Sequence, residues 1–369
     1  MVDSDPIWEE VLSLAARGIY STSPNPRVGA VLVASDGTVV GRGFHERAGG
    51  PHAEVRALAQ AGGRARGSTL YVNLEPCAHQ GRTPPCSDAL VAAGVTRVLA
   101  SLEDPDPRTS GRGMARLREH GVETAVGGAA EAAARLNEAF LLSAALGRPF
   151  VHLKWASSLD GKTAASSRAS KWITGAEARE DVLRLREECD AILVGSGTVL
   201  ADDPRLTRRL GLNRSIHPHR KVVLDGDGLV DAGAGVFSPE EPGEAWLFTC
   251  REAADPSLEP FRRRGVRVET RHVGKDGFDL GTVLRRLHEL EVRSVLVEGG
   301  GETAWTFLAA GLADRVTAYL APSLIGGSTA PTPLGGEGFP DIARLPRLVG
   351  LDVVRLGEDL RVSGRVGLP

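Results

Sequence analysis

Two short segments between residues 51 and 86 decide how this chain is interpreted. The first reads Pro51-His52-Ala53-Glu54, and the second reads Pro76-Cys77-Ala78-His79-Gln80-Gly81-Arg82-Thr83-Pro84-Pro85-Cys86. One imidazole and two thiols are ligands that hold a zinc ion and leave a fourth position open for water. We therefore predict a zinc site formed by His52, Cys77 and Cys86.

The carboxylate of Glu54 separates a catalytic zinc site from a structural one. A closed structural site takes a fourth Cys or His and has no use for a carboxylate at this spacing. In a catalytic site the carboxylate takes a proton from the water and passes it to the substrate. H-x-E followed by P-C-x-x-C is the pattern of zinc-dependent base deaminases, although eight residues separate the cysteines here. We predict that Glu54 is the catalytic acid and base.

Each of these residues alone has a plainer interpretation. A lone His at a helix start is more often a cap, and a lone Cys is usually a small core residue. We expect a helix to begin near His52 and further helices to begin after Cys77 and after Cys86, where the helix field favours a thiolate. Because three ligands are already supplied, we expect His79 to order the loop or to contact the substrate.

The composition is that of a globular protein with more than one core. The 369 residues are 42% hydrophobic and 25% charged, with a formal net charge of −3. That charge gives no general attraction to nucleic acid or to anionic membranes, and no apolar run reaches the roughly 18 residues of a membrane span. Four cysteines do not form a disulfide scaffold, and thiol ligands must stay reduced. We expect a cytoplasmic protein without a secretory signal.

Strands alternate with helices along the chain, which predicts an α/β fold. Gly147-Arg148-Pro149 reads as a boundary, so we predict domains at residues 1–147 and 148–369. In the first domain we expect a hairpin at Asp36-Gly37, strands at 69–74, 97–100 and 123–126, and a single helix over 129–146. In the second we expect strands at 150–155, 191–194, 221–224, 245–249, 294–297 and 315–320, and helices at 177–188, 280–290 and 303–310.

The second domain is less informative on its own. Gly195-Ser196-Gly197-Thr198-Val199-Leu200 does not fit G-x-G-x-x-G, so the Rossmann fingerprint is absent. A strand enters Gly299-Gly300-Gly301 before a helix, where backbone N–H groups can bind phosphate, but a tight turn with positive φ explains the glycines equally well. Ser170, Arg186 and Arg209 suit either phosphate binding or an ordinary surface.

Motifs in both halves resemble the bifunctional deaminase/reductase family of riboflavin biosynthesis. The resemblance covers almost the whole chain, and the wide loop between the cysteines is the expected form in that family. In the first half it is carried by Pro24-Asn25-Pro26-x-Val28-Gly29, His52-Ala53-Glu54 and the segment from Glu75 to Cys86. In the second half it is carried by Lys154-x-x-x-Ser158-Leu159-Asp160-Gly161-Lys162, Trp172-Ile173-Thr174, the segment from Gly197 to Thr207, and Val297-Glu298-Gly299-Gly300.

This resemblance implies a cytidine-deaminase-like three-layer α/β/α domain followed by a dihydrofolate-reductase-like α/β domain that uses NADPH. The implied reactions are zinc-dependent hydrolytic deamination of 2,5-diamino-6-ribosylamino-4(3H)-pyrimidinone 5′-phosphate and then NADPH-dependent reduction of its ribosyl group to ribityl. The implied cofactor-binding residues are Ala156, Thr163, Trp172, Thr198, Asp202, Gly300, Gly301, Glu302 and Thr303. The implied substrate-binding residues are Lys154, Ser170, Arg186, Leu206, Arg209 and Glu298.

Other implications are less specific. The resemblance implies a homo-oligomer that associates through the second domain, and it leaves Lys154, Asp202 and Glu298 as candidates to assist opening of the ribose. Gly226 departs from the family pattern, which has a serine contacting NADP there. A nucleoside or tRNA-base deaminase with an unrelated C-terminal domain is the first alternative, but 5% aromatic residues and the net charge of −3 do not favour an RNA-binding surface. A zinc-stabilised binding protein is the second, and Glu54 argues against it.

Overall fold

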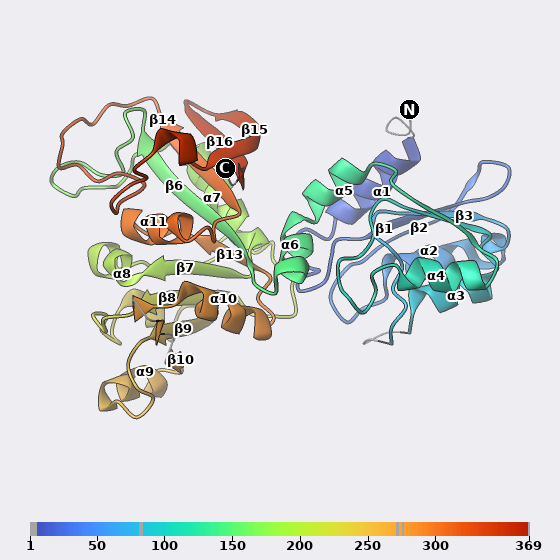
Figure 1. Ribbon diagram of the computed structural model, residues 1–369, viewed down its shortest axis with the longest axis horizontal. Coiled ribbons are helices and arrows are strands. Elements are labelled where there is room, and N and C mark those ends of the chain that lie inside the picture. The colour runs from blue at the N-terminus through green and yellow to red at the C-terminus, as the bar shows by residue number, and fades with distance from the viewer. Residues whose placement is uncertain (1–5, 81–83, 271–272, 275–276, 368–369) are drawn as a thin grey trace. The chain divides into compact units, whose positions relative to one another are not determined.

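The computed structural model describes residues 6–80, 84–270, 273–274 and 277–367, and its chain divides into two compact units (Figure 1). The first unit comprises Met1–Gly147 together with Leu212–Ile216, and the second comprises Arg148–Gly211 together with His217–Pro369. Both units contain a sheet flanked by helices, which confirms the predicted α/β class. Within the described residues, the structure has no helix that is both long and apolar enough to span a membrane.

The first unit is a five-stranded sheet between two helical layers. The strand order is β2-β1-β3-β4-β5; β1 is antiparallel to β2 and β3, and β3, β4 and β5 are parallel. Its elements are α1 (Pro6–Ala16), β1 (Gly29–Val33), β2 (Val39–Phe44), α2 (Ala53–Ala61), η1 (Gly62–Ala65), β3 (Thr69–Val72), α3 (Cys86–Ala93), β4 (Arg97–Ala100), α4 (Arg112–Glu119), β5 (Glu123–Val126), α5 (Ala130–Leu136) and α6 (Glu138–Leu146).

Alternation along the strands divides the core of this unit between the two faces of the sheet. Ala57 of α2, Leu90 of α3 and Leu117 of α4 are fully buried in the cluster on one face. Trp8 and Val11 of α1 pack against Val31 on the other. The sheet is therefore sandwiched between α2, α3 and α4 on one side and α1 on the other.

Two glycines of β2 let α2 lie very close to the sheet. A Cβ at Gly43 would lie 2.1 Å from the carbonyl oxygen of Ala53, and a Cβ at Gly41 would lie 2.2 Å from that of Ala57. Any side chain at either position would push the helix away. Because α2 begins at Ala53, this contact also fixes the position of the two residues beside its start, His52 and Glu54.

The second unit is built on a nine-stranded sheet with the order β10-β9-β8-β7-β13-β6-β14-β16-β15. The first seven strands in this order, β10-β9-β8-β7-β13-β6-β14, are parallel to one another. The β15–β16 hairpin adds two antiparallel strands at one edge. Its elements are β6 (Phe150–Ser158), α7 (Ala176–Glu188), β7 (Ala191–Gly195), α8 (Ser196–Asp202), β8 (Arg220–Asp225), η2 (Gly235–Phe237), β9 (Glu244–Thr249), η3 (Pro256–Leu258), α9 (Glu259–Arg263), β10 (Arg267–Thr270), β11 (Val273–Gly274), β12 (Gly277–Phe278), α10 (Leu280–Glu289), β13 (Ser294–Val297), α11 (Gly301–Ala309), β14 (Arg315–Ala321), η4 (Ile342–Arg344), β15 (Arg347–Leu356) and β16 (Asp359–Gly367).

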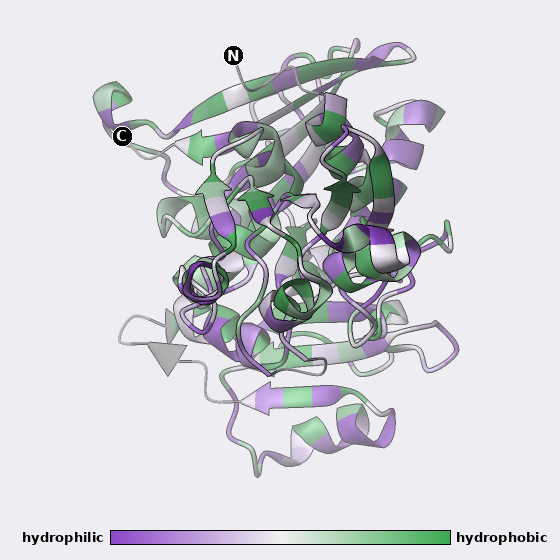
Figure 2. Ribbon diagram, turned by 90° about the vertical axis from the view of Figure 1, so that its right-hand side faces the viewer, coloured by the Kyte–Doolittle hydropathy of each residue, from purple (hydrophilic) through white to green (hydrophobic). Residues whose placement is uncertain are grey.

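Helices also cover both faces of this sheet. Figure 2 shows that helices of the molecule carry both hydrophilic and hydrophobic residues, as expected for helices with one face on a sheet. Leu284 and Leu287 of α10 and Phe307 of α11 pack in the cluster on one face. Val199 of α8 and Phe261 of α9 pack in the cluster on the other. Both faces are buried, so the central parallel strands read as continuous apolar runs rather than alternating ones.

Among the helices and strands, one expected helix is divided into two, and one hairpin was not expected. The single helix expected over 129–146 is two helices, α5 and α6, which meet at Asn137. The side chain of Asn137 accepts a hydrogen bond from the Arg27 amide (2.8 Å) and donates one to the Arg27 carbonyl (2.9 Å), so a contact with a distant segment coincides with the break. The β15–β16 hairpin was not expected at all, because its strands lack a clear alternation of apolar and polar residues.

Candidate active sites

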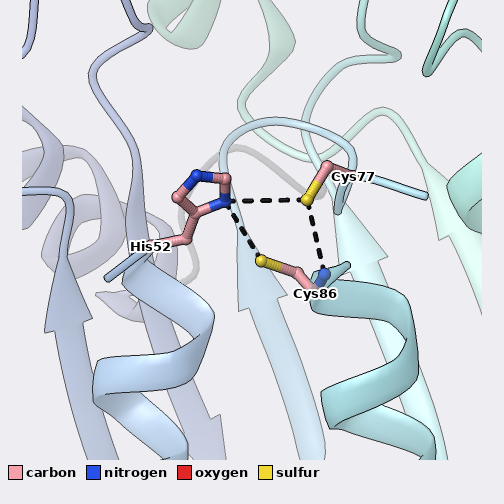
Figure 3. A group of neighbouring side chains, drawn as sticks. All are labelled: His52, Cys77 and Cys86. Atoms are coloured by element: carbon pink, nitrogen blue, oxygen red, sulfur yellow. Dashed lines mark hydrogen bonds between the residues drawn. The ribbon is translucent and has the colours of Figure 1, made fainter. Parts of the chain in front are cut away.

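Three side chains from separate elements of the first unit converge on one point (Figure 3). His52 is the N-cap of α2, Cys77 lies in the loop after β3, and Cys86 is the first residue of α3. His52 Nδ1 lies 3.2 Å from Cys86 Sγ and 3.6 Å from Cys77 Sγ. One ligand atom from each of the three residues lies within 4.8 Å of the others. The structure thus brings together the three residues that the sequence predicted as ligands.

The spacing of these atoms fits a zinc ion. Zinc bonds of about 2.0–2.1 Å to nitrogen and about 2.3 Å to sulfur, meeting at the tetrahedral angle, place the nitrogen and sulfur about 3.6 Å apart. Both of the His52–Cys separations are close to that value. The donor set of one imidazole and two thiols is also the one that zinc prefers over magnesium or calcium.

The thiols differ in how readily they give up a proton. Hydrogen bonding from the Cys86 thiol, helped by His52 and by the Cys86 amide (N···Sγ 3.3 Å), outweighs burial and lowers the pKa of Cys77 to about 4. The hydrogen bond to the Cys77 sulfur, together with burial, raises the pKa of Cys86. The expectation that a helix begins after Cys77 was wrong. Instead, the first amide of α3 donates a hydrogen bond to the Cys77 sulfur, and Cys86 is itself the first residue of α3. Both cysteines therefore lie at the start of the same helix.

Glu54 lies in the first turn of α2 and is 3% exposed. Burial raises the pKa of its carboxyl, and the nearby Cys77 raises it further, whereas His52 lowers it. A hydrogen bond with Cys86 links the carboxyl to the ligand set. The side chain is therefore held beside the three ligand residues in a setting where a carboxyl can both hold and release a proton.

Glu75 holds the loop that carries Cys77. Its Oε2 accepts hydrogen bonds from the amides of Gly111 (2.9 Å) and Asp104 (3.3 Å), and its Oε1 accepts one from the Met114 amide (3.1 Å). Gly111 and Met114 belong to the start of α4, so Glu75 caps this helix from a distant segment. Gly113 of the same helix turn is also required, because a Cβ there would lie 1.8 Å from the Pro76 carbonyl oxygen.

Sequence reasoning did not assign a role to two further residues beside the ligands. His45 packs edge-on against His52 with ring centroids 5.3 Å apart, and burial lowers its pKa to about 4. Its Nδ1 lies 3.2 Å from the Pro51 carbonyl oxygen, and its Nε2 lies 3.1 Å from Asn25 Nδ2. A neutral His45 that donates from Nδ1 and accepts at Nε2 satisfies both contacts. Asn25 belongs to the Pro24-Asn25-Pro26 motif, and this motif is the sequence feature that could have pointed to a role for Asn25 beside the ligands.

The loop between the cysteines is partly described. His79 Nδ1 lies 3.2 Å from the Thr109 hydroxyl, which agrees with the expected loop-ordering role. Gly81, Arg82 and Thr83 of the same motif lie outside the described residues.

A buried cluster of charges lies in the second unit. Glu298, directly after β13, accepts two hydrogen bonds from Arg186 of α7, at 2.6 Å from Nε and 2.9 Å from Nη2. Lys154 Nζ of β6 lies 3.6 Å from Glu298 Oε2, and the side chains of Lys154 and Glu298 are 15% and 8% exposed. Burial alone would raise the pKa of Glu298, but Arg186 and Lys154 lower it to about 2. Burial lowers the pKa of Lys154.

Each of the two units matches a known protein family. Residues 4–102 match the cytidine and deoxycytidylate deaminase zinc-binding region, and residues 149–362 match the RibD C-terminal domain. Riboflavin biosynthesis protein RibD of Aquifex aeolicus is 42% identical, with 95% of this chain and 94% of that protein covered. The Escherichia coli protein of the same name is 40% identical, with 95% of each chain covered.

The chain belongs to the RibD family. Solved structures agree: Acinetobacter baumannii RibD has a TM-score of 0.86 at 39% identity and covers 97% of both chains. A Thermotoga maritima diaminohydroxyphosphoribosylaminopyrimidine deaminase/5-amino-6-(5-phosphoribosylamino)uracil reductase has a TM-score of 0.83 at 35% identity and covers 98% of both. As a RibD protein, the chain is a bifunctional enzyme of riboflavin biosynthesis with a zinc-dependent deaminase domain and an NADPH-dependent reductase domain.

The fold of this RibD chain brings part of the predicted cofactor set together. The Gly300 amide donates to the Thr198 hydroxyl (2.8 Å), which joins α8 to the start of α11. Thr303 packs against the end of β7, where a Cβ at Gly195 would lie 2.4 Å from the Thr303 hydroxyl oxygen. The first amides of α11, at Gly301, Glu302 and Thr303, have no partner within the helix, and Gly300 before them is exposed. This turn fits a phosphate of NADPH.

The other predicted reductase residues are spread over several segments of the second unit. Ala156 is half-buried in β6, and Thr163 follows that strand, with its amide bonded to the Pro331 carbonyl (2.9 Å). Leu206 is buried, and its carbonyl accepts from His219 (2.6 Å), while Arg209 is exposed and bonds the Thr207 hydroxyl (3.3 Å). Some predicted residues are not joined to the others. In the described part of the chain, Ser170, Trp172 and Asp202 make no hydrogen bond to another predicted site residue.

Trp172 is available as an aromatic platform. Its side chain is 71% exposed, and one face is covered by the Arg179 guanidinium, 4.7 Å from the ring centroid. Gly226, the position that departs from the family pattern, lies near the ring of Phe278 and the sulfur of Cys250, at 3.4 Å and 3.7 Å from where a Cβ would be. A serine there would meet those side chains at ordinary or slightly tight contact distance, so the structure gives no strong steric reason for glycine.

Proposed function

We propose that this chain first deaminates 2,5-diamino-6-ribosylamino-4(3H)-pyrimidinone 5′-phosphate and then reduces the ribosyl group of the product to ribityl. The deaminase domain comprises residues 1–147 and the reductase domain residues 148–369. The observation that carries the proposal is the convergence of His52, Cys77 and Cys86 beside the buried Glu54, in a chain whose second half matches the RibD reductase domain. The substrate is the one implied by the printed name of the Thermotoga maritima relative.

In the deaminase domain, His52, Cys77 and Cys86 hold the zinc ion, which supplies an acidified water when it is bound. The Glu54 carboxylate takes a proton from that water and transfers it to a ring nitrogen of the pyrimidine. After the new C–O bond forms, Glu54 would take the remaining proton from the added hydroxyl group and pass it to the amino group; the C–N bond then breaks, the hydroxyl oxygen becomes the carbonyl oxygen, and ammonia leaves. Burial of Glu54 keeps bulk water from competing for these protons.

The Glu54→Gln substitution tests this assignment. The amide has the same size but cannot carry the proton, so we expect zinc to be retained and ammonia release to be lost. Zinc content by atomic absorption and ammonia by a coupled assay measure the two effects. Glu103→Gln, an exposed position, is the control. Ammonia release by Glu54→Gln at the control's rate would contradict the assigned role.

In the reductase domain, the contacts of Lys154, Asp202 and Glu298 indicate which of these residues can donate a proton when the ribose ring opens. Glu298 is held at a pKa of about 2 by two cations and cannot donate a proton at neutral pH. Asp202 is exposed at the end of α8. Burial lowers the pKa of Lys154, so its ammonium group releases a proton more readily than an exposed lysine would. NADPH supplies a hydride to C1′ when it is bound. We propose that, as the C1′–O4′ bond breaks, Lys154 Nζ donates a proton to O4′, which becomes a hydroxyl group.

The same cluster distinguishes the two predicted phosphate ligands. Three N–H groups of Arg186 are engaged, two by Glu298 and one by the Thr207 carbonyl (3.2 Å). Arg209 is exposed and makes one long hydrogen bond. We therefore assign the 5′-phosphate to Arg209, with Ser170 and Leu206 beside the substrate, and assign Arg186 the role of holding Glu298 in place.

The Lys154→Met substitution tests the proton donor. Met fills a similar volume without a charge, so we expect ammonia release to continue and NADPH oxidation to fall by at least about a hundredfold, the range of general acid catalysis. Following both signals in one reaction mixture separates the two sites. If Lys154→Met oxidised NADPH at the wild-type rate, another group would have to protonate O4′.

Two further properties belong to this proposal. The thiol ligands require a reducing compartment, which supports the cytoplasm. We also propose that the reductase domain forms a homo-oligomer through its edge strand β15, where Val349, Leu351 and Val353 are 49%, 58% and 58% exposed. Light scattering of the Val353→Glu variant tests this association: a molar mass equal to that of the wild type would contradict it.

A further inference from the structure

Two acidic side chains of the reductase domain are bonded to the same long loop. We call residues 323–336 the strap. Near its start, Asp160 Oδ1 accepts from the Ile325 amide (3.0 Å) and Oδ2 from the Gly326 amide (2.7 Å). At its end, Glu302 Oε1 accepts from the Gly336 amide (3.1 Å). Asp160 follows β6 and Glu302 is in the first turn of α11, so the two carboxylates join the strap to two different segments.

Backbone contacts reinforce both connections. On the β6 side, the Leu159 amide donates to the Ser323 carbonyl (2.9 Å) and the Thr163 amide to the Pro331 carbonyl (2.9 Å). Lys162 Nζ adds a hydrogen bond to the Ala330 carbonyl (3.3 Å). On the α11 side, the Gly335 amide donates to the Gly301 carbonyl (3.0 Å). The strap is therefore attached along its length rather than only at its ends.

Glycines make the contact with α11 possible. A Cβ at Gly301 would lie 2.7 Å from the Thr332 carbonyl oxygen, and a Cβ at Gly335 would lie 2.2 Å from Glu302 Oε1. Gly336 has φ of +65°, and a Cβ there would lie 1.9 Å from the Trp305 ring. The strap and the start of α11 thus approach more closely than any other residue type would allow.

Each of the two segments joined in this way carries predicted cofactor residues. Thr163 lies on the β6 side, and Gly300 to Thr303 lie on the α11 side. We infer that Asp160 and Glu302 are positioning residues that fix the strap, and through it the separation of these two NADPH-contacting segments. Glu302 acts through Gly336 rather than as a ligand of the cofactor. The inference rests on the proposed cofactor residues.

The energetic reason is preorganisation. Without the strap, binding of NADPH would have to order two loops as well as form its own contacts. A hydrogen bond to a charged acceptor contributes at least about 1.5 kcal/mol, which corresponds to roughly a tenfold change in affinity. We therefore expect the loss of either carboxylate to raise the Kd and KM for NADPH about tenfold, with a smaller effect on kcat.

The experiment compares Asp160→Ala and Glu302→Ala with the wild-type full-length protein. Amide hydrogen exchange in the absence of NADPH reports on the strap, and NADPH fluorescence titration gives the Kd. We expect faster exchange at residues 325–326 in the first variant and at residue 336 in the second, each with weaker NADPH binding. Glu302→Gln keeps an oxygen for the Gly336 amide and should restore most of the affinity. Glu337→Ala, an exposed neighbour, is the matched control, and unchanged hydrogen exchange in the buried strand β13 shows that the reductase domain of each variant is folded.

Each remaining outcome has one meaning. Faster exchange at residue 336 in Glu302→Ala with wild-type NADPH affinity would overturn the positioning role. Weaker binding with unchanged exchange, and no rescue by Glu302→Gln, would make Glu302 a direct cofactor ligand and would also overturn it. A wild-type protein that does not bind NADPH would instead refute the proposed cofactor site, and this inference with it.

Discussion

We expect the Glu75→Gln substitution to destabilise the deaminase domain and weaken its zinc site, although Glu75 is not a ligand. The carboxylate is 4% exposed and accepts hydrogen bonds from three backbone amides, those of Asp104, Gly111 and Met114. The substitution keeps the size of the side chain and replaces one of its acceptor oxygens by a donor. Cys77 lies two residues away on the same loop, so a shift of Glu75 moves a proposed zinc ligand.

The magnitude follows from counting amides. In the best case the single oxygen of Gln takes the place of Oε2 and serves the Asp104 and Gly111 amides. The Met114 amide then faces an NH₂ group, and an unsatisfied buried donor costs about 1–3 kcal/mol. The other two bonds lose their charged acceptor, which makes them roughly half as strong. We expect a loss of about 2–4 kcal/mol in the free energy of unfolding of this domain.

Native-state hydrogen exchange measures this loss directly. Amides of α4 in the variant should exchange faster by a factor that corresponds to the lost free energy, while amides of the reductase domain serve as an internal reference. Competition with a chromophoric chelator gives the zinc affinity. Glu103→Gln removes an exposed carboxylate from the loop between β4 and α4 and is the matched control. If Glu75→Gln changed α4 exchange no more than this control, the capping role would be refuted.

Two further predictions follow from the structure. Gly113→Ala should destabilise the deaminase domain by about 1–3 kcal/mol and reduce zinc affinity, because its Cβ would overlap the Pro76 carbonyl oxygen at 1.8 Å; Gly63→Ala, which meets nothing within 4 Å, is the control in urea titrations, and equal effects would contradict the argument. Burial lowers the pKa of both His152 and His219 to about 3. Below pH 6.5 the unfolded chain therefore binds protons that the folded chain does not, and the free energy of unfolding decreases as the pH is lowered. Each histidine should cost the reductase domain about 2 kcal/mol between pH 7 and pH 5, a loss that tryptophan fluorescence in urea can measure and that should be smaller in His152→Gln.

The grouping of His52, Cys77 and Cys86 could be predicted from the sequence because these residues are marked by local patterns. His52 and Glu54 are two residues apart, and both cysteines stand in one proline-bounded segment. The pattern did not show that the α3 start supports both thiols, because the Cys86 amide meets the Cys77 sulfur only after the loop between them has folded. It did not show His45 either, because no spacing rule connects that residue to His52.

The contacts that hold these sites in place could not be predicted, because their partners are far apart in the chain. Glu75 bonds amides 29 to 39 residues away, and Asp160 bonds amides 165 and 166 residues away. The same reason explains the error at Asn137, where the sequence favours an unbroken helix and a contact with Arg27, 110 residues away, accompanies the break. Periodicity reports local preference, and these contacts depend on topology.

The role of each acidic residue near the two sites therefore follows from its partners rather than from its type. Glu75, Asp160 and Glu302 are bonded to backbone amides, so they hold segments in place. Glu298 is bonded to Arg186 and faces Lys154, and these cations keep it ionised, so it balances buried charge and cannot donate a proton. Glu54 differs from all four, because the groups around it are the proposed zinc ligands themselves. A carboxylate whose neighbours are the ligands of the metal is placed to exchange protons with whatever that metal binds, and this placement, more than the His-x-Glu spacing, supports its catalytic role.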